Sequence, residues 1–501
     1  MLAICKPKIQ SHIIVVVMEE QDPFLQFFQE IPLPFKFVTF PYPGSKGEQR
    51  HQYLKLYINE VISVLILRSF NRAGFPQTSD KIVWNTSWGQ QYDPPEYQAC
   101  RSWQKINHFA GAYLLGRKDE FHMRMREAIS RVGSFIDFYP ESYLSSTELI
   151  PLIMNWKKYK VWIAKPFASS KGEGIFLVDS DKSLPPKDCV VQQYIKNPLL
   201  IGNKKFDVRL YILVTSISPV RIYLHEYGLV RFATHEYSDE SPIDDLCTHL
   251  TNFSINSKEE GFKQCQGLQD LNDECSKWSL QHLYSYLESN GYDTNHLKSE
   301  FERISATCVL AGISKYRRVH QQLVPHRHTS YELYGIDILI DSSFKCWVME
   351  VNISPSMSGS DSPLDQEIKS QIASEVLNLA RIIDCDPENP TTASSLYDEE
   401  WKSSIISNSK KDAKAIWESP SFADIANVRD FIEEKSLLKR FKRIFPRKTN
   451  IDTYMKIFET PSYSDRSFIE WIKMSKEQRR ECINQGKTVY LQSLLKIQNK
   501  L

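Results

Sequence analysis

The stretch YGIDILIDSSFKCWVMEVNISP, residues 334–355, reads as two apolar strands joined by a short turn. Glu350 and Asn352 lie two positions apart on the second strand, so their side chains point to the same face of the hairpin. A turn centred on Ser343 and Phe344 sets the register. The expected cross-strand pairs are Ile340 with Trp347, Leu339 with Val348, and Asp337 with Glu350.

Opposed carboxylates destabilise a hairpin unless a cation lies between them, because their Cβ atoms are only about 5 Å apart. Magnesium is a hard ion that prefers carboxylate and amide oxygens. The sequence therefore predicts a magnesium site formed by Asp337, Glu350 and Asn352. The alternative, in which each acid pairs with a neighbouring Arg or Lys, stays open at this point.

Composition indicates a globular protein of two to four domains, since the chain has 501 residues, 42% of them hydrophobic and 25% charged. The net charge of +1 excludes a molecule that is strongly charged as a whole. Ten cysteines without a CxxC pair, and no secretory signal, indicate free thiols in a reducing cytosol. Cys265 and Cys275 are ten apart with no histidine at finger spacing, which argues against a zinc site.

Several segments predict the organisation of the chain. Residues 1–110 mix short apolar runs with turns and suggest a small α/β unit, with an early buried strand at Ile13–Met18 that is too short to span a membrane. From residue 160 the sequence is strand-rich and predicts a mostly antiparallel sheet. Residues 276–325 predict helices, and residues 386–400 are polar and predict a linker.

The loop of WIAKPFASSKGEGIFLVD, residues 162–179, follows a strand that ends near Lys165. Backbone N–H groups of such a loop, together with Lys171, can contact phosphates. It is not a Walker A loop, because no GxxxxGK[ST] pattern or following helix is present. A purely structural hairpin turn is the alternative.

Two further stretches carry polar side chains between apolar ones. In VVQQYIKNPLLIGNKKFDVRLYILV, residues 190–214, the segment from Gln192 to Ile195 can hydrogen-bond an adenine edge, and the following strand alternates polar and apolar faces. Arg209 in that strand either serves the site or neutralises a neighbouring acid. In CTHLTNFSIN, residues 247–256, Thr251 and Asn252 can contact a terminal phosphate.

Seven ordered motifs resemble the tubulin tyrosine ligase-like enzymes, in particular the glutamylase branch. They are WIAKPFASSKGEGI, QQYI, KFDVRLYILVTS, GLVRF, HLTNFSIN, YGIDILID and VMEVNISPS, and the resemblance runs from about Asn107 to Arg381. It implies an α/β fold of the ATP-grasp type, with two α/β lobes around a mostly antiparallel sheet. We accordingly expect an N-terminal α/β domain (1–110), a central lobe (111–205), a C-terminal lobe (206–385), and a linker with a basic helical extension (386–501).

The resemblance also implies roles for individual residues. The implied ATP-binding positions are Lys165, Lys171, Gly172, Gln192, Gln193, Tyr194, Ile195, Lys205, Phe206, Asp207, Thr251 and Asn252. The implied positions for the substrate glutamate are Arg231, Phe253, Ser254, Lys277 and Lys369. The implied magnesium ligands are Asp337, Glu350 and Asn352, and the catalytic set is Lys165, Arg209, Asp337 and Glu350. Lys171 stands where many relatives have Arg, and Phe253 where they have Tyr, so we expect altered affinity for nucleotide or glutamate.

The implied activity is tubulin polyglutamylation, the ATP- and magnesium-dependent ligation of glutamate to glutamate side chains in tubulin tails through an acylphosphate, with two magnesium ions. Glycine ligation, glutamylation of another acidic protein, and an inactive microtubule-binding protein are the alternatives. The expected partners are tubulin and free L-glutamate, for a monomer that binds neither nucleic acid nor membrane. The expected location is the cytoplasm and cytoskeleton, including cilium, basal body or centriole.

The run KSLLKRFKRIFPRK, residues 435–448, contains seven Lys or Arg and no acid. A solvated basic helix face is the ordinary explanation of such a run. Next to an acidic substrate such as a tubulin tail, a basic docking module is the favoured interpretation.

Overall fold

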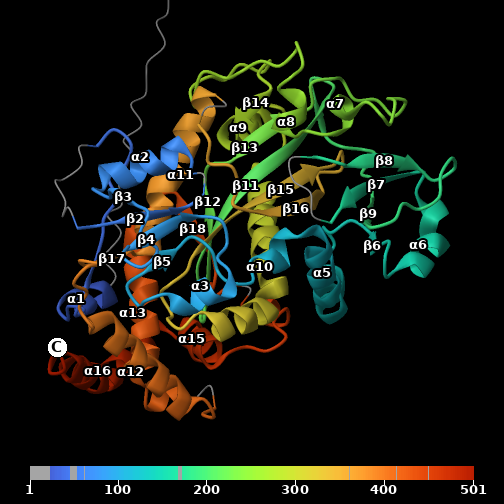
Figure 1. Cartoon of the computed structure of the whole chain (residues 1–501). Helices are drawn as coiled ribbons and strands as arrows, with labels where there is room; N and C mark the ends of the chain where they lie inside the picture. Colours follow the sequence, from blue (N-terminus) through green and yellow to red (C-terminus); the bar gives the residue numbers. More distant parts are fainter. Residues whose placement is uncertain are drawn as a thin grey trace, which may run out of the picture.

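The computed structural model describes residues 23–45, 53–60, 62–167, 172–359, 362–412, 415–449 and 451–501. The strand expected at Ile13–Met18 and the phosphate-loop residue Lys171 lie outside these ranges. The described chain has a mixed α/β architecture built on four sheets, of which the two larger antiparallel ones frame the candidate site (Figure 1).

The central sheet has eight strands, and every pairing in it is antiparallel. Its longest strand, β11, pairs with β15 along one edge and with both β12 and β13 along the other. The strands are β10 (Leu200–Ile201), β11 (Lys204–Ile217), β12 (Val220–His225), β13 (Leu229–Phe232), β14 (Lys277–Ser279), β15 (Glu332–Ile340), β16 (Cys346–Ile353) and β18 (Phe441–Phe445). The expected strand-rich, mostly antiparallel region is thereby confirmed.

A smaller antiparallel sheet of four strands lies to one side of the molecule (Figure 1). Its strand order is β6-β9-β7-β8. The strands are β6 (Ser142–Leu144), β7 (Val161–Pro166), β8 (Phe176–Asp179) and β9 (Cys189–Gln193), and helix α6 (Leu149–Asn155) follows β6. Trp162 and Trp156 stack face to face in the small core of this sheet, with ring centroids 5.7 Å apart.

The N-terminal part is an α/β unit with a parallel sheet of order β3-β2-β4-β5. It contains β2 (Leu56–Asn59), β3 (Gln77–Thr78), β4 (Thr86–Gly89), β5 (Lys105–Ile106), α1 (Pro23–Gln29), α2 (Val64–Arg72) and α3 (Pro94–Ala99). The pair β1 (Lys36–Phe37) and β17 (Ile383–Asp384) joins it to the C-terminal half. Helices α4 (Tyr113–Gly116) and α5 (Lys118–Val132) follow.

The remaining helices pack around the central sheet and below it (Figure 1). They are α7 (Leu246–His249), α8 (Phe253–Asn256), α9 (Leu280–Ser289), α10 (Thr294–Leu323), α11 (Pro363–Ala380), α12 (Ala393–Asn408), α13 (Phe422–Leu437), α14 (Ile451–Met455), α15 (Tyr463–Lys473) and α16 (Lys476–Gln498). The helical prediction for 276–325 holds from Leu280, whereas Lys277–Ser279 is the edge strand β14. Ser279 caps α9 by accepting from the N–H group of His282 at 3.0 Å.

The predicted hairpin forms, but its register near the turn differs by one residue. Asp341 accepts hydrogen bonds from the N–H groups of Ser343 and Lys345 (2.9 and 3.1 Å), which lengthens the turn. The observed pairs are Ile340 with Cys346, Leu339 with Trp347 and Ile338 with Val348. The register shifts at the next pair, where Met349 is the extra residue of a β-bulge, and Asp337 then faces Glu350 as predicted.

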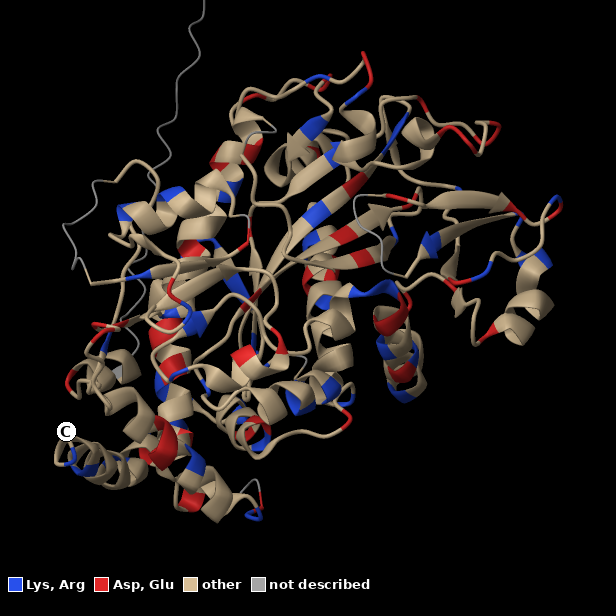
Figure 2. Ribbon diagram, in the orientation of Figure 1, with Lys and Arg blue, Asp and Glu red and all other residues tan. Residues whose placement is uncertain are grey.

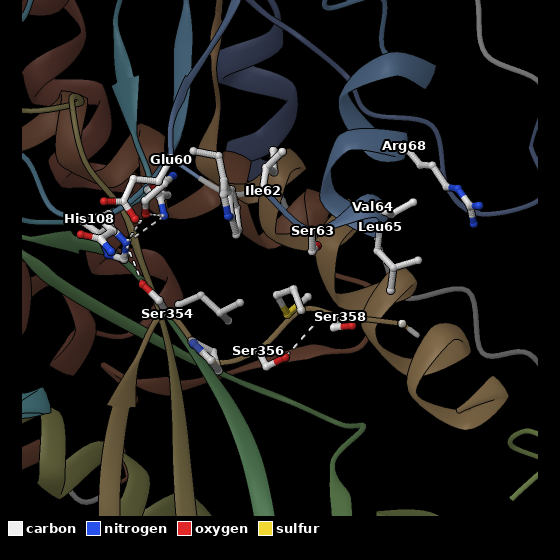
Figure 3. A pocket seen from close by; sticks show the side chains of 18 of the residues that line it. Glu60, Ile62, Ser63, Val64, Leu65, Arg68, His108, Ser354, Ser356 and Ser358 are labelled. Carbon is white, nitrogen blue, oxygen red and sulfur yellow. Dashed lines mark hydrogen bonds between the residues drawn. The ribbon is translucent and has the colours of Figure 1, made fainter. Parts of the chain in front are cut away.

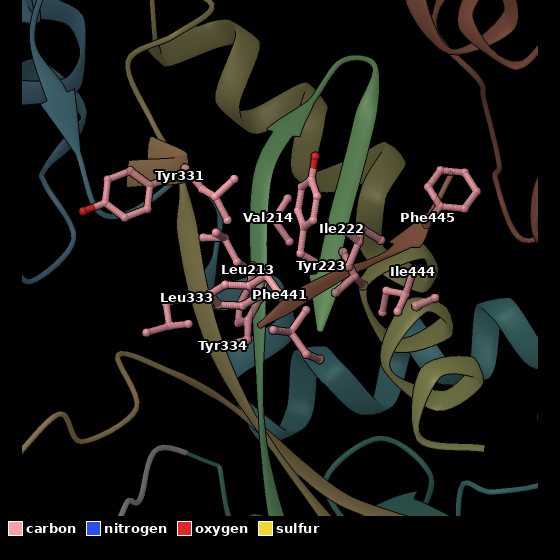
Figure 4. Packing of buried hydrophobic residues seen from close by; sticks show 14 of the residues in the cluster. Leu213, Val214, Ile222, Tyr223, Tyr331, Leu333, Tyr334, Phe441, Ile444 and Phe445 are labelled. Atoms are coloured by element: carbon pink, nitrogen blue, oxygen red, sulfur yellow. The ribbon is translucent and has the colours of Figure 1, made fainter. Parts of the chain in front are cut away.

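The basic run 435–448 does not form the solvated helix face that is the ordinary explanation of such a run, although α12 to α16 lie within the expected helical extension. Helix α13 ends at Leu437, and Phe441–Phe445 forms strand β18, which pairs with β12 as an edge of the central sheet. Phe441, Ile444 and Phe445 are buried in the main core cluster (Figure 4). This cluster also contains residues of α13, α15 and α16. Because these three side chains are apolar and pack in the core, this part of the basic run forms a strand and not a solvated helix. The domain boundaries at 110, 205 and 385 stay a prediction.

Candidate active site

A pocket lies between the small sheet and the central sheet, and most of the predicted nucleotide residues line it. Its walls come from β7, β9, β11, β13, β15, β16 and the segment after α7. The predicted residues among its lining are Lys165, Gln192, Gln193, Tyr194, Ile195, Lys205, Asp207, Arg231, Thr251, Asn252, Asp337 and Glu350. Acidic and basic segments lie close together on these central strands (Figure 2).

Lys165 on β7 reaches from the small sheet to the hairpin of the central sheet. Its Nζ donates to Oε1 of Gln192 at 2.7 Å and to the carbonyl oxygen of Met349, the bulge residue, at 3.1 Å. Gln192 donates in turn to Oγ of Ser142 at 2.9 Å, which fixes its orientation. Burial lowers the pKa of Lys165 to about 8, although Glu350 opposes this effect.

Lys205 at the start of β11 provides a second buried ammonium group. Its Nζ donates to the hydroxyl of Tyr194 at 3.1 Å and lies 4.4 Å from the centroid of that ring. The same hydroxyl is 2.8 Å from Nδ1 of His249. Burial lowers the pKa of Lys205 to about 7, and Asp207 counteracts only part of that effect.

The structure brings the three predicted metal ligands together. The Nδ2 atom of Asn352 donates to Oδ2 of Asp337 at 3.3 Å and to Oε1 of Glu350 at 3.1 Å. The Nζ atom of Lys118 lies 3.9 Å from the other oxygen of Glu350. Two carboxylates and one amide therefore converge on one face, which is a donor set that suits magnesium once the Asn352 amide turns its oxygen inward.

Two arginines also contact this acidic face. Arg209 on β11 donates from both Nε and Nη2 to Asp337, the second contact at 2.8 Å, and Nη2 of Arg231 lies 3.0 Å from Oδ2 of Asp337. Arg231 also donates to both oxygens of Asp207, with its Nε at 2.9 Å. Burial alone would raise the pKa of Asp337, but the two guanidinium groups hold it well below its ordinary value. The alternative of acids paired with arginines thus applies to Asp337. Its Oδ2 has three donors, Arg209, Arg231 and Asn352, whereas Oδ1 accepts from Arg209 and keeps a second lone pair for a cation.

The predicted substrate lysines share one buried acid. The carboxylate of Asp365 lies 2.8 Å from Nζ of Lys277 and 2.7 Å from Nζ of Lys369. The ammonium group of Lys277 lies 3.9 Å from the ring centroid of Phe253. Asp365 is fully buried, and Oγ of Ser362, the N-cap of α11, donates to it at 2.7 Å.

Three predicted residues have a different placement. The side chain of Phe206 is completely buried and packs on Phe232 at a centroid distance of 5.5 Å, so it belongs to the core and not to the pocket. Gly172 has a φ of +83°, and a Cβ there would lie 3.2 Å from the side chain of Asn252, so the end of the phosphate loop approaches that segment. Ser254 lies in α8 outside the pocket lining.

Sequence reasoning missed four participants in this region. They are Ser142, the carbonyl of Met349, Lys118 and Asp365. The spacing of Asp365 and Lys369, four positions apart in an amphipathic helix, could have indicated their contact. The other three come from separate elements, and the sequence has no local signal for them.

A second and larger cavity, of about 670 Å³, opens between α2 and the loop that follows β16 (Figure 3). Its wall includes Ser354, Ser356 and Ser358, which come directly after the predicted metal ligands, and Arg68 on α2. His108 lies at one end of it, where Nε2 is 2.9 Å from Oγ of Ser354 (Figure 3).

Comparison with known proteins decides the family. The sequence profile described as the tubulin-tyrosine ligase family matches residues 97–389, which include the small sheet and every strand of the central sheet except β18. The chain belongs to the tubulin-tyrosine ligase family.

Individual relatives within this family are similar over most of the chain. The tubulin polyglutamylase TTLL5 of Mus musculus is 34% identical over 359 residues, 70% of this chain and 27% of that protein. The tubulin polyglutamylase ttll-4 of Caenorhabditis elegans is 29% identical over 484 residues, 92% of this chain and 79% of that protein. The tubulin monoglutamylase TTLL4 of Homo sapiens is 30% identical over 462 residues, 85% and 38% of the two chains. The chain therefore spans less than a third of the length of the mouse TTLL5 relative.

Two further features of the chain are the state of its cysteines and the apolar character of its helices. All cysteines within the described residues are free thiols, as the sequence predicted. Within the described ranges, none of the helices combines the length and apolar composition that a membrane crossing requires.

Proposed function

We propose that the chain is a tubulin glutamate ligase that joins glutamate to glutamate side chains of tubulin tails at the expense of ATP. The observation that carries this proposal is the convergence of Lys165, Asp337 and Glu350 in one pocket of a tubulin-tyrosine ligase family member, with Asn352 hydrogen-bonded to both carboxylates. The curated relatives named above as polyglutamylases and a monoglutamylase support glutamate as the added amino acid and tubulin as the acceptor.

The fold proposed for this activity is ATP-grasp, in which nucleotide binds between two sheets. The pocket supports this proposal because one wall is the small sheet and the other is the central sheet. The backbone of residues 192–195 faces the adenine, and Lys165 and Lys205 contact the phosphates. Both ammonium groups are buried, so their attraction to phosphate is screened little by water.

Asp337, Glu350 and Asn352 would hold magnesium, two ions in our proposal, which neutralises charge on the phosphates during transfer. Arg209 keeps Asp337 ionised and fixes its orientation. Lys165 brings a positive charge next to Glu350 from the opposite sheet. The chain thereby places cations where two anions, the triphosphate and the acceptor carboxylate, must meet.

The incoming glutamate would bind near Arg231, Phe253, Ser254, Lys277 and Lys369. The ion pairs with buried Asp365 hold the side chains of Lys277 and Lys369 in place. Their ammonium groups are thereby oriented for the carboxylates of the substrate. The acceptor tail would lie in the cavity beside Ser354 and reach the metal ligands along the loop that follows them. We propose that an oxygen of the acceptor carboxylate attacks the γ-phosphorus of ATP and displaces ADP, which gives an acylphosphate. The amine of glutamate then attacks the acyl carbon, displaces inorganic phosphate and loses a proton, which leaves the amide bond.

The proposed enzyme acts as a monomer on the cytoskeleton, including cilia, basal bodies and centrioles. Ligation of glycine, modification of another acidic protein, and microtubule binding without turnover are the competing functions. One experiment distinguishes these functions. The protein is incubated with ATP, magnesium, microtubules and either labelled glutamate or labelled glycine. Incorporation of glutamate into tubulin supports the proposal. Incorporation of glycine alone, or of neither amino acid, would contradict it.

A further inference from the structure

The loop between α8 and β14 brings two cysteines and an aspartate together. The Sγ atoms of Cys265 and Cys275 and a carboxylate oxygen of Asp270 all lie within 4.8 Å of one another. Among the residues that the structure describes, this is the one such group of three His, Cys, Asp or Glu side chains. Cys265 is 1% and Cys275 4% exposed, so both thiols are shielded from solvent.

Backbone contacts hold this loop folded back on itself. Asp270 accepts from the N–H group of Gln266 at 2.8 Å, and its own N–H group donates to the carbonyl oxygen of Gly267 at 3.2 Å. The thiol of Cys275 donates to Oδ2 of Asp270 at 3.9 Å. A spacing of ten residues gave no finger pattern in the sequence, and the proximity of the cysteines arises only from this fold.

A buried histidine beside the loop has an unused nitrogen. His282 is 4% exposed, its Nε2 lies 2.9 Å from Oδ1 of Asp273, and its Nδ1 is buried without a hydrogen-bond partner in the described structure. A histidine that binds metal through one nitrogen commonly donates its other N–H group to a carboxylate, and His282 and Asp273 have this arrangement.

We propose that Cys265, Asp270 and Cys275 bind a zinc ion, with Nδ1 of His282 as the fourth ligand. Zinc prefers four tetrahedral ligands from thiolate, imidazole and carboxylate groups. Each thiol would release a proton to solvent on binding. Ligands at ordinary Zn–S distances lie roughly 3.8 Å apart. The loop must therefore contract slightly, and the ring of His282, which lies outside the group of three, must move toward the ion.

The proposed ion would stabilise the amino-acid side of the candidate active site without taking part in chemistry. The loop leads directly into β14, which carries Lys277. Its residue Leu268 donates from its N–H group to Glu367 of α11 at 2.8 Å, and α11 carries Lys369. Zinc at this position would therefore hold in place a loop that leads into Lys277 and contacts α11, the helix that carries Lys369. This inference goes beyond the proposed function and does not depend on it.

Metal analysis of the full chain tests the proposal. Protein purified without chelators from zinc-containing medium is expected to carry about one zinc per chain, as measured by inductively coupled plasma mass spectrometry. Cys265→Ser and Cys275→Ser are each expected to lose the zinc, and Cys247→Ser, a partly buried cysteine outside the group, is expected to keep it. His282→Asn is expected to weaken zinc affinity about tenfold or more.

A second readout does not require folded variants. Cobalt added to the metal-free wild-type chain is expected to give a thiolate-to-cobalt charge-transfer absorption. Three results would overturn the proposal: wild-type protein without zinc or cobalt binding, a Cys265–Cys275 disulfide in freshly purified protein, or full zinc retention in the double serine variant. An unchanged zinc affinity of His282→Asn would overturn the role of that residue. Ligase activity is a separate measurement, so failure of the proposed function would leave these results interpretable.

Discussion

Arg209 and Asp337 are directly opposed across β11 and β15, and the guanidinium group of Arg209 donates to both carboxylate oxygens of Asp337. This ion pair lies on the face where Glu350 and Asn352 also point. The hairpin therefore tolerates Asp337 by two means, the ion pairs with Arg209 and Arg231 and, in our proposal, a bound cation. Cross-strand register fixes this arrangement, because Asp337 directly faces Arg209 on one neighbouring strand and Glu350 on the other.

The first prediction concerns the metal ligands. Glu350→Gln removes one negative charge without changing shape, so we expect normal folding and a loss of ligase activity of about 100-fold or more. Binding of Mn²⁺, used as a paramagnetic probe of the magnesium site, should weaken in parallel. The matched control is Glu388→Gln, a carboxylate 67% exposed on the surface, which should behave like the wild type. Full turnover in Glu350→Gln would remove the metal assignment.

The second prediction concerns the pH dependence of ATP binding. Burial lowers the pKa of Lys205 to about 7 and that of Lys165 to about 8, so both lysines lose protons as the pH rises through these values. Phosphate binding favours the charged forms. ATP affinity should therefore fall between about pH 6 and pH 9, by at most about tenfold per pH unit for each lysine. Calorimetry in buffers of different ionisation enthalpy should detect proton uptake on binding at pH 8.

Lys205→Arg is the informative comparison for this prediction. Arginine keeps its charge in proteins, so the variant should take up fewer protons on ATP binding even if its affinity is lower. Proton release, or the same proton uptake in both proteins, would contradict the assignment of Lys205 to the phosphates.

The sequence was sufficient for much of this site because alternation along a strand determines which side chains share a face. Glu350 and Asn352 share one face because the bulge at Met349 precedes both residues. The same logic could not locate that bulge, since it depends on how Asp341 lengthens the turn. Likewise β18 reads as basic helix in isolation, and only its pairing with β12 makes Phe441–Phe445 a strand. Contacts between distant elements, such as Lys277 with Asp365, have no local signature.

The third prediction concerns the larger cavity as the acceptor channel. Arg68 on α2 is an exposed cation at its rim (Figure 3), so Arg68→Glu should repel an acidic tail. We expect the KM for tubulin to rise about threefold to tenfold, which corresponds to about 1 kcal/mol, with no change in the KM for ATP. Arg101→Glu, at an exposed position outside the cavity lining, is the matched control. Equal effects of both substitutions would argue against the channel.

The fourth prediction concerns the buried ion pair that joins the N-terminal unit to the central sheet. Glu332 lies 2.7 Å from Nδ1 of His108 and accepts from the N–H group of Phe109 at 3.1 Å. Glu332→Ala leaves both donors buried without a partner and should reduce the free energy of unfolding by about 3–5 kcal/mol. A clear fall in the thermal unfolding midpoint would confirm this, and a midpoint as high as that of Glu388→Ala would contradict it.

The fifth prediction separates two kinds of basic residue within 435–448. Lys439 and Lys448 are exposed, whereas Arg443 donates to the carbonyl oxygen of Phe431 at 2.7 Å and lies 3.4 Å from the centroid of its ring. Lys439→Gln with Lys448→Gln should therefore weaken microtubule binding about twofold to tenfold at low salt and less at high salt, because exposed charges are screened. Arg443→Gln should instead lower the thermal unfolding midpoint, since it removes internal contacts of β18. Co-sedimentation with microtubules at two salt concentrations measures the first effect. If the double lysine variant binds microtubules as tightly as the wild type at low salt, this edge of the sheet has a structural role and does not bind the acidic microtubule surface.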